Sequence, residues 1–146
     1  MTPTLRAARP EDWPGIRRLL EARDLPVEGA QVHLAEFLVA TGTSTDVIGV
    51  AGLERHGDVG LVRSVAVAAD EAARGLGTAL TRAVLSRARR EGLRSLYLLT
   101  TTAATWFPRF GFAVVSRDEL PAALNASAEL RGACPSTAVA MRLLLH

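Results

Sequence analysis

The junction between an alternating apolar segment and a long amphipathic segment most constrains the fold of this 146-residue chain. Residues 59–68 favour a strand, and residues 75–91 carry apolar side chains at the i, i+3, i+4, i+7 spacing of a helix. Between them, residues 74–77 (Arg-Gly-Leu-Gly) place glycines where the helix begins. The first N–H groups of a helix have no partners within it, and the helix dipole is positive at that end, so a helix N-terminus attracts anions. Glycines have no side chain and therefore let a phosphate approach the backbone closely. The junction therefore predicts a site for a di- or polyphosphate.

The spacing of these glycines excludes two common nucleotide-binding loops. A Gly-x-x-x-x-Gly-Lys-Ser/Thr loop needs a lysine, and all 17 basic residues of this chain are arginine. A Gly-x-Gly-x-x-Gly loop needs a third glycine where the chain has Leu80. By itself, the remaining Gly-x-Gly pattern is equally compatible with a tight start of the helix and no ligand.

Hydrophobic periodicity and turn residues divide the rest of the chain into short elements. The expected strands are residues 5–7, 37–39, 47–55, 93–100, 112–115 and 137–145. The expected helices are residues 10–23, 27–34, 103–110 and 121–130. Residues 47–55 and 59–68 should form an antiparallel hairpin, and residues 93–100, the most hydrophobic strand, should be central. Because no linker or repeat divides the chain, we expect a single α+β domain over residues 1–146.

Composition excludes several classes of protein. Hydrophobic residues make up 49% and charged residues 22%, as in globular domains, and no apolar run reaches the roughly 18 residues of a membrane span. The first ten residues carry no apolar signal segment, so we expect a cytoplasmic protein. The only cysteine, Cys134, excludes an intrachain disulfide and a cysteine-based metal site, and we expect no metal. The arginines of residues 82–94 spread around the expected helix without aromatic residues, so we expect neither a nucleic-acid nor a membrane partner.

Three segments together resemble the GNAT acetyltransferase superfamily: residues 65–67, 74–80 and 107–112. In that family the glycine loop binds the pyrophosphate of acetyl-CoA, and the preceding strand splays from its neighbour and pairs with the pantetheine arm. The resemblance thus implies a GNAT fold, in which helices flank a mixed, mostly antiparallel sheet with a splayed central strand pair, and acetyl-CoA as co-substrate. Ala72 stands where the family usually has Gln or Arg. The cofactor-binding residues that the resemblance implies are Val65, Ala66, Val67, Ala72, Ala73, Arg74, Gly75, Leu76, Gly77, Thr78 and Phe107.

Two narrower resemblances concern the substrate. Residues 63–67, 98–102, 106–107 and 111–112 resemble the acetyltransferase domain of N-acetylglutamate synthases. Residues 118–121 and 134–138 are more similar to the amino-acid N-acetyltransferases of arsenic-resistance operons. Together they imply direct transfer of the acetyl group to the amine of a small amino acid or an amino-acid-like toxin, with arsenic resistance as one setting. The implied partners are acetyl-CoA and this small amine, and a homodimer is compatible with the sequence.

Direct transfer needs a group that takes the amine proton and support for the leaving thiolate. The tyrosine that the family uses as acid is replaced by Phe107, which cannot donate a proton, and the only tyrosine, Tyr97, is expected in the core. Glu54 is our candidate base, acting through a water, and His56 in the adjoining turn is a competing one. The alternative for Glu54 is an ordinary surface carboxylate on a strand.

Arg63 lies in a strand between the apolar residues Leu61 and Val65, and an unpaired charge there would be costly. Its anionic partner is Glu54 or Asp58, or else the carboxylate of a substrate, which a guanidinium fits in bidentate fashion. Strand alternation places Ser64 on the opposite face. We therefore assign catalytic roles to Glu54 and Arg63, and substrate-binding roles to Arg63, Thr100 and Thr101; the threonines have strand-end capping as their alternative.

Two other functions stay open. A catalytically silent acyl-CoA-binding module would explain both Phe107 and Ala72. A peptide N-terminal acetyltransferase would share the fold and need an open groove in place of a closed pocket.

Overall fold

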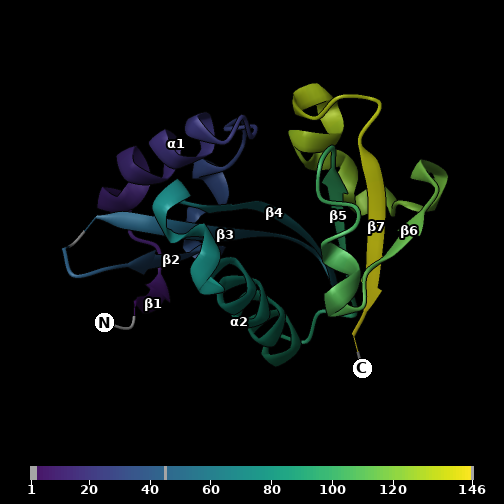
Figure 1. Ribbon diagram of the computed structural model, residues 1–146. Helices are drawn as coiled ribbons and strands as arrows, with labels where there is room; N and C mark the ends of the chain where they lie inside the picture. The colour runs from purple at the N-terminus through teal and green to yellow at the C-terminus, as the bar shows by residue number, and fades with distance from the viewer. Residues whose placement is uncertain (1–2, 45, 146) are drawn as a thin grey trace.

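The computed structural model describes residues 3–44 and 46–145, and only the backbone of residues 72–74. A mixed sheet of seven strands runs through these residues in the order β1-β2-β3-β4-β5-β7-β6 (Figure 1). Only β4 and β5 pair in parallel, and the other neighbours are antiparallel. The strands are β1 Thr4–Ala7, β2 Leu38–Thr41, β3 Val47–His56, β4 Val59–Val67, β5 Ser95–Thr100, β6 Ala113–Val115 and β7 Val139–Leu144. This confirms the expected α+β fold with a mixed, mostly antiparallel sheet.

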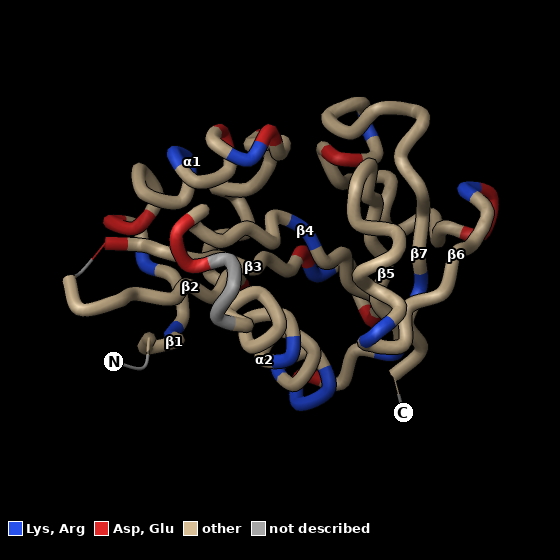
Figure 2. Tube along the Cα trace, viewed as in Figure 1, with Lys and Arg blue, Asp and Glu red and all other residues tan. Residues whose placement is uncertain are grey.

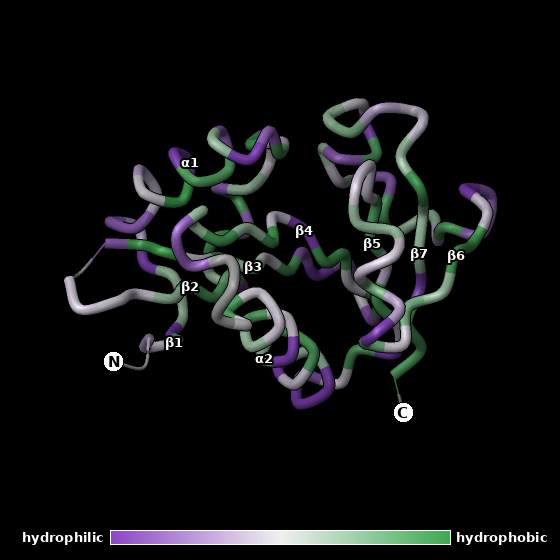
Figure 3. Tube along the Cα trace, in the orientation of Figure 1, coloured by the Kyte–Doolittle hydropathy of each residue, from purple (hydrophilic) through white to green (hydrophobic). Residues whose placement is uncertain are grey.

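Two α-helices cover opposite faces of the half of the sheet that β1 to β4 form (Figure 1). α1 (Trp13–Ala22) buries Ile16 and Leu20 against Phe37 on one face. α2 (Leu76–Arg90) buries Leu80 and Val84 against the other face. Figure 3 shows hydrophobic and hydrophilic residues alternating along both helices, as expected for helices with one buried face. The helical periodicity of the sequence thus identified both packing faces.

The remaining helical segments are short. They are η1 Pro10–Asp12, η2 Gln31–Glu36, η3 Ala69–Arg74, η4 Phe107–Phe110, η5 Arg117–Glu119, η6 Ala122–Ala126 and η7 Glu129–Ala133. The expected helices at residues 27–34 and 121–130 are therefore wrong in type and extent, and residues 103–110 form only η4. In the last segment, positive φ at Gly132 breaks the helical path, so η7 ends after one turn. No helix in the described part of the chain is long and apolar enough to cross a membrane.

The sheet splits between β4 and β5. Residues 59–61 of β4 pair with residues 95–97 of β5, and the pairing ends there. Beyond this point the two strands diverge, so that β5, β7 and β6 form a separate half of the molecule (Figure 1). The expected splayed central pair is confirmed. The strand at residues 95–100 is interior, flanked by β4 and β7.

A β-bulge in β4 marks the start of this split. The pairing of β3 with β4 jumps from Gly52–Arg63 to Val50–Ala66, and Ser64 has a φ of 59°. The bulge interrupts side-chain alternation. The Arg63 guanidinium therefore meets Ser64, with Nε donating to Oγ at 3.0 Å. The expectation that Ser64 faces away from Arg63 is wrong for this reason.

Candidate functional site

A cavity of about 680 Å³ lies between the two diverging halves. Its wall combines residues 62–67 of β4 with residues 99–103 at the end of β5. Gly77 contributes from the start of α2, and the loop after α1 contributes residues 23–26 and Glu28. The far end is closed by Glu129 of η7 and residues 133–135. The cavity thus runs from the first turn of α2 to a charged end beneath η7.

The first turn of α2 forms one end. Gly75 caps this helix with a φ of 73°, a conformation that a glycine adopts without strain. Its carbonyl accepts the amide of Ala79 at 3.0 Å, which leaves the preceding N–H groups without partners inside the helix. Gly77 lies against Trp106, because an added Cβ would be 3.8 Å from the indole ring. This end therefore offers backbone donors beside an aromatic wall.

The structure brings most of the expected cofactor-binding residues to this end. Val65, Ala66, Val67, Gly77 and Phe107 line the cavity. Gly75, Leu76 and Thr78 belong to the same helix start, although the Leu76 side chain is buried in the core, so only its backbone is available. The backbones of Ala72, Ala73 and Arg74 form part of η3, and their side chains lie outside the described residues.

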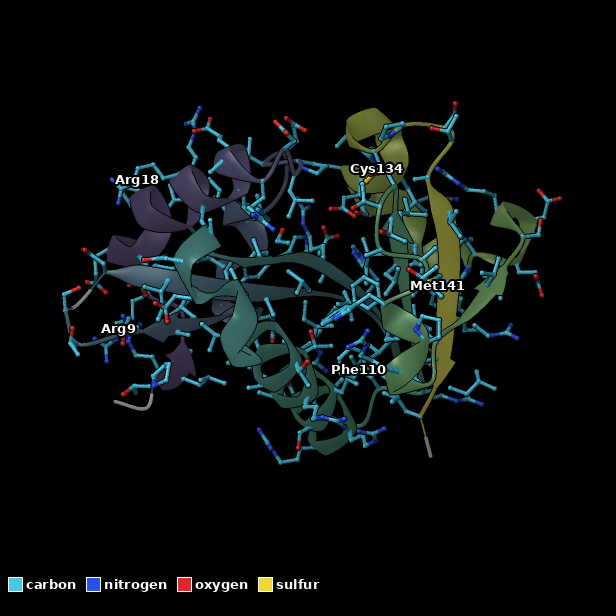
Figure 4. All side chains as sticks on the ribbon, viewed as in Figure 1. Arg9, Arg18, Phe110, Cys134 and Met141 are labelled. Carbon is cyan, nitrogen blue, oxygen red and sulfur yellow. The ribbon has the colours of Figure 1, made fainter. Side chains whose placement is uncertain are left out.

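Aromatic residues without an acidic hydroxyl stand where the family has its tyrosine, as the sequence indicated. Phe107 is buried and meets Trp106 edge-on at a ring distance of 4.9 Å. Figure 4 shows the neighbouring Phe110 packed between α2 and the C-terminal half. Tyr97 packs with Leu61 and Leu124 in a separate cluster, which confirms its expected place in the core. Among the described residues that line the cavity, no tyrosine is present.

Arg63 organises the other end of the cavity. Its guanidinium is fully buried and donates from Nη1 to Oε2 of Glu54 at 2.7 Å. Nε lies 3.3 Å from Oε2 of Glu129, and Nη2 donates to the carbonyl of Pro26 at 3.2 Å. Of the two expected partners within the chain, the structure selects Glu54, whereas Asp58 pairs with Arg94. One arginine is therefore shared by two carboxylates.

Glu54 is placed differently from both sequence interpretations. Its side chain is fully buried, and it lies behind Arg63 instead of on the cavity wall, so it is no surface carboxylate. Oε1 is 2.8 Å from Nε2 of His56 and 3.5 Å from Nε2 of His33. Burial alone would raise the pKa of Glu54, but hydrogen bonds from Arg63, His56 and Ser127 outweigh it and hold that pKa below its ordinary value. Its role as base stays a prediction.

Glu129 is the carboxylate that the sequence interpretation missed. It lines the cavity and is 4% exposed. Burial raises the pKa of Glu129 to about 7, the negative charge of Glu54 adds to the rise, and Arg63 opposes it. No motif surrounds this residue, and it reaches Arg63 only because η6 packs against β4 and carries the following η7 to that strand. The one signal in the sequence was the need of Arg63 for anionic partners.

Cys134 lies beside Glu129 and lines the same end of the cavity. Figure 4 shows it at the inner edge of the C-terminal half, on the side toward α1. Burial and the Glu129 carboxylate raise the pKa of the Cys134 thiol to about 12. The thiol is therefore protonated at neutral pH and is not a nucleophile.

The threonines that follow β5 have unequal roles. Thr100 Oγ1 accepts the amide of Ala103 at 2.9 Å, the capping alternative expected for this residue. Thr101 is exposed on the cavity wall, where its hydroxyl can meet a ligand. The wall also carries Arg23, Asp24 and Glu28. Figure 2 shows acidic residues both in the segment after α1 and in the C-terminal half.

Comparison with known proteins gives a consistent family. A family model described as an acetyltransferase (GNAT) domain matches residues 33–114. The amino-acid acetyltransferase of Mannheimia succiniciproducens is 30% identical over 126 residues, which cover 80% of this chain and 28% of that protein. The amino-acid acetyltransferase of Neisseria meningitidis serogroup A is 29% identical over 129 residues, which cover 81% and 29%. The chain thus spans less than a third of the length of these relatives.

Solved structures agree with this family. N-acetylglutamate synthase from Neisseria gonorrhoeae, complexed with coenzyme A and N-acetyl-glutamate, superposes with a TM-score of 0.83 at 26% identity, over 100% of this chain and 36% of that one. Rv2747 from Mycobacterium tuberculosis, in complex with CoA and NLQ, superposes with a TM-score of 0.80 at 25% identity, over 99% and 100% of the two chains. Ard1 from Thermoplasma volcanium, at 21% identity and a TM-score of 0.76, shares the fold over 100% of this chain and 99% of its own.

Proposed function

Because the chain belongs to the GNAT acetyltransferase family, we propose that it transfers the acetyl group of acetyl-CoA to the amine of a small amino acid or an amino-acid-like compound. The observation that carries the proposal is the cavity at the split between β4 and β5. This cavity joins the phosphate-binding geometry of the α2 start to a buried arginine with two carboxylates. It therefore offers a place for each reactant.

Acetyl-CoA would occupy the end formed by β4 and α2. Its pyrophosphate fits the free N–H groups at residues 75–78, where the helix dipole adds a favourable field. The pantetheine arm would pair with residues 65–67, whose edge toward β5 is no longer used by the sheet. An amide of this segment is also suited to hold the carbonyl oxygen as it becomes an oxyanion.

The amine would approach from the charged end and give its proton to Glu129. A base with a pKa near the working pH transfers protons most effectively, and Glu129 is the cavity carboxylate with a pKa of about 7. The free amine then attacks the acetyl carbonyl, and its nitrogen loses a second proton to water. The carbon–sulfur bond breaks, and the leaving thiolate takes a proton from water. Glu54 would act indirectly, by holding Arg63 in place.

Arg63 is our candidate for the substrate carboxylate. Its guanidinium is shared by Glu54 and Glu129. As a bound amino acid gives its amine proton to Glu129, one of these two negative charges is removed, and the carboxylate of the same amino acid would take that place on Arg63. Thr101 on the wall would contribute a hydroxyl to the same ligand.

The test is a panel of amines incubated with the protein and acetyl-CoA, with release of free thiol as the measurement. We expect turnover of amino acids and a much weaker reaction of matched amines that lack the carboxylate. If acetyl-CoA binds but no amine of the panel causes release of free CoA thiol, the protein is instead a silent acyl-CoA-binding module. Preference for peptides over free amino acids would identify a peptide N-terminal acetyltransferase.

The arsenic-resistance setting stays a prediction from sequence resemblance. An amino acid analogue whose side chain carries an arsenic oxyacid belongs in the same panel. Faster acetylation of this analogue than of its arsenic-free counterpart would support that setting.

A further inference from the structure

Two histidines and a glutamate meet behind Arg63, on the side away from the cavity. Glu54 and His56 are two residues apart on β3 and share one face of the strand. η2 brings His33 to the same face, because Gly52 leaves room for the ring of Phe37, which an added Cβ would strike. The ligand atoms of the three side chains all lie within 4.8 Å of one another. Side chains from two separate segments thus converge on one point.

We propose that His33, Glu54 and His56 form a binding site for a divalent transition-metal ion such as Zn²⁺. Such ions bind imidazole nitrogen and carboxylate oxygen at about 2.0–2.2 Å, which separates the ligand atoms of a tetrahedral site by about 3.3 Å. The distances from Oε1 of Glu54 to the two Nε2 atoms, 2.8 Å and 3.5 Å, bracket that separation. The ion would therefore need only small shifts of the three side chains.

The two oxygens of Glu54 have separate surroundings. Oε2 accepts the hydrogen bond from Arg63, and Oε1 faces the histidines. Metal-bound carboxylates are commonly held in this way by a hydrogen bond to their second oxygen. A metal ion would take the place of the hydrogen bond between His56 and Oε1, while the bond to Arg63 persists. Arg63 thus orients the Glu54 carboxylate through Oε2 and leaves Oε1 available to the ion.

Charge and access also favour a cation at this position. Arg63 contacts two carboxylates, so this group carries an excess negative charge when both are ionised. The His33 side chain is 24% exposed, which gives an ion a route from solvent. Two imidazoles and one carboxylate suit Zn²⁺, Co²⁺, Ni²⁺ and Cu²⁺ better than Mg²⁺ or Ca²⁺, which prefer oxygen ligands. With three protein ligands, a fourth position stays open to water.

The experiment is calorimetric titration of the chelator-treated protein with Zn²⁺, together with the visible spectrum of the Co²⁺ form. We expect one ion per chain and a Co²⁺ spectrum with nitrogen and oxygen ligands. In metal sites generally, replacing a residue that only holds a ligand in place weakens metal binding about 10- to 100-fold. His33 and His56 would be ligands themselves, so His33→Ala and His56→Ala should each weaken Zn²⁺ binding by at least about 100-fold. His33 is the decisive position, because its partial exposure makes the variant tolerable to the fold.

Two controls separate this site from adventitious binding. Cys134→Ser tests a thiol ligand, and His146→Ala tests the remaining histidine, which lies outside the described residues. Both should leave the Zn²⁺ affinity within about twofold, a free-energy change of about 0.4 kcal/mol. Zn²⁺ affinity unchanged in His33→Ala would overturn the proposal, as would the absence of binding to the unmodified protein. Acetyl-CoA binding is measured alongside and does not depend on the outcome.

Discussion

The two ends of the cavity are built in opposite ways. The end at α2 uses backbone groups from one continuous stretch, in which β4 runs into η3 and the helix start. The end at Arg63 uses charged side chains from β3, β4 and η7. Two of them, Glu54 and Glu129, are 75 residues apart in the sequence. Backbone donors are set by local conformation, whereas a charge cluster exists only after the chain has folded. The first end should therefore tolerate substitution until its shape or charge is changed, and the second should depend on every partner.

The largest effect should come from Arg63→Ala, which strikes the end made of side chains. Glu54 would remain fully buried without its guanidinium, and breaking a buried pair in this way costs about 3–5 kcal/mol of unfolding free energy. Urea unfolding measures the loss. The triple variant Arg63→Met, Glu54→Gln and Glu129→Gln should recover most of it, because neither carboxylate then stays buried as a charge without Arg63.

Arg23→Ala is the matched control for that prediction. Arg23 is an exposed arginine on the same cavity wall, and its loss should change the free energy of unfolding by about 0.5 kcal/mol or less.

A second substitution at Arg63 tests its proposed role in substrate binding. After correction for any loss of folded protein, Arg63→Lys should impair turnover of amino acids more than that of amines without a carboxylate, since an ammonium lacks the bidentate geometry of a guanidinium. Equal losses for both kinds of amine would show that Arg63 serves the fold alone.

The next effect concerns the backbone end. Gly75→Asp would place a carboxylate beside the N–H groups of α2, and we expect acetyl-CoA binding to weaken by about 100-fold through repulsion of the phosphates. Gly75→Asn is the matched control, because asparagine has the same shape and also tolerates the left-handed conformation. It should weaken binding by less than about tenfold. Similar affinities of the two variants in calorimetry would mean that the helix start does not bind the phosphates.

The same contrast explains what the sequence revealed. The glycines at the α2 start and Tyr97 in the core follow from local patterns, whereas the splayed strand pair was implied by the resemblance to the GNAT family; the structure agrees with each. The pairing of Arg63 with Glu54 was among the expected alternatives, because a charge inside an apolar strand needs a partner. Glu129 and the turn of Ser64 toward Arg63 were not predictable. The position of Glu129 depends on how η7 packs in the folded chain. The orientation of Ser64 depends on a β-bulge, which the alternation of apolar and polar residues does not predict.

An effect that is spread over pH should come from Glu129. Its pKa rises from 4.5 to about 7 on folding, so between these values the folded protein holds a proton that the unfolded chain has lost. This residue therefore makes the free energy of unfolding fall with rising pH by about 1.4 kcal/mol per unit across that window. Glu129→Gln should remove this slope, measured as the difference in urea unfolding between variant and wild type from pH 4.5 to 8.

The same substitution tests the proposed base. Wild-type kcat/KM should rise through pH 7 as Glu129 loses its proton, and the variant should lack that inflection. Glu28→Gln, an exposed carboxylate on the same wall, should keep the wild-type profile. If Glu54→Gln removes the inflection and Glu129→Gln keeps it, the sequence-based choice of Glu54 as base is the correct one.

The smallest effect should come from Phe107→Tyr, which adds a hydroxyl to an aromatic ring that lines the cavity. The ring is fixed by Trp106 at 4.9 Å and Phe112 at 5.8 Å, so the substitution should leave the fold intact. If water protonates the leaving thiolate, kcat should stay unchanged or rise by about tenfold or less, below the usual gain from a positioned acid. Phe107→Leu, without a hydroxyl, should show no rise. A fall in kcat with Tyr97→Phe at unchanged acetyl-CoA affinity would move the acid to Tyr97, and the aromatic wall would then serve packing alone.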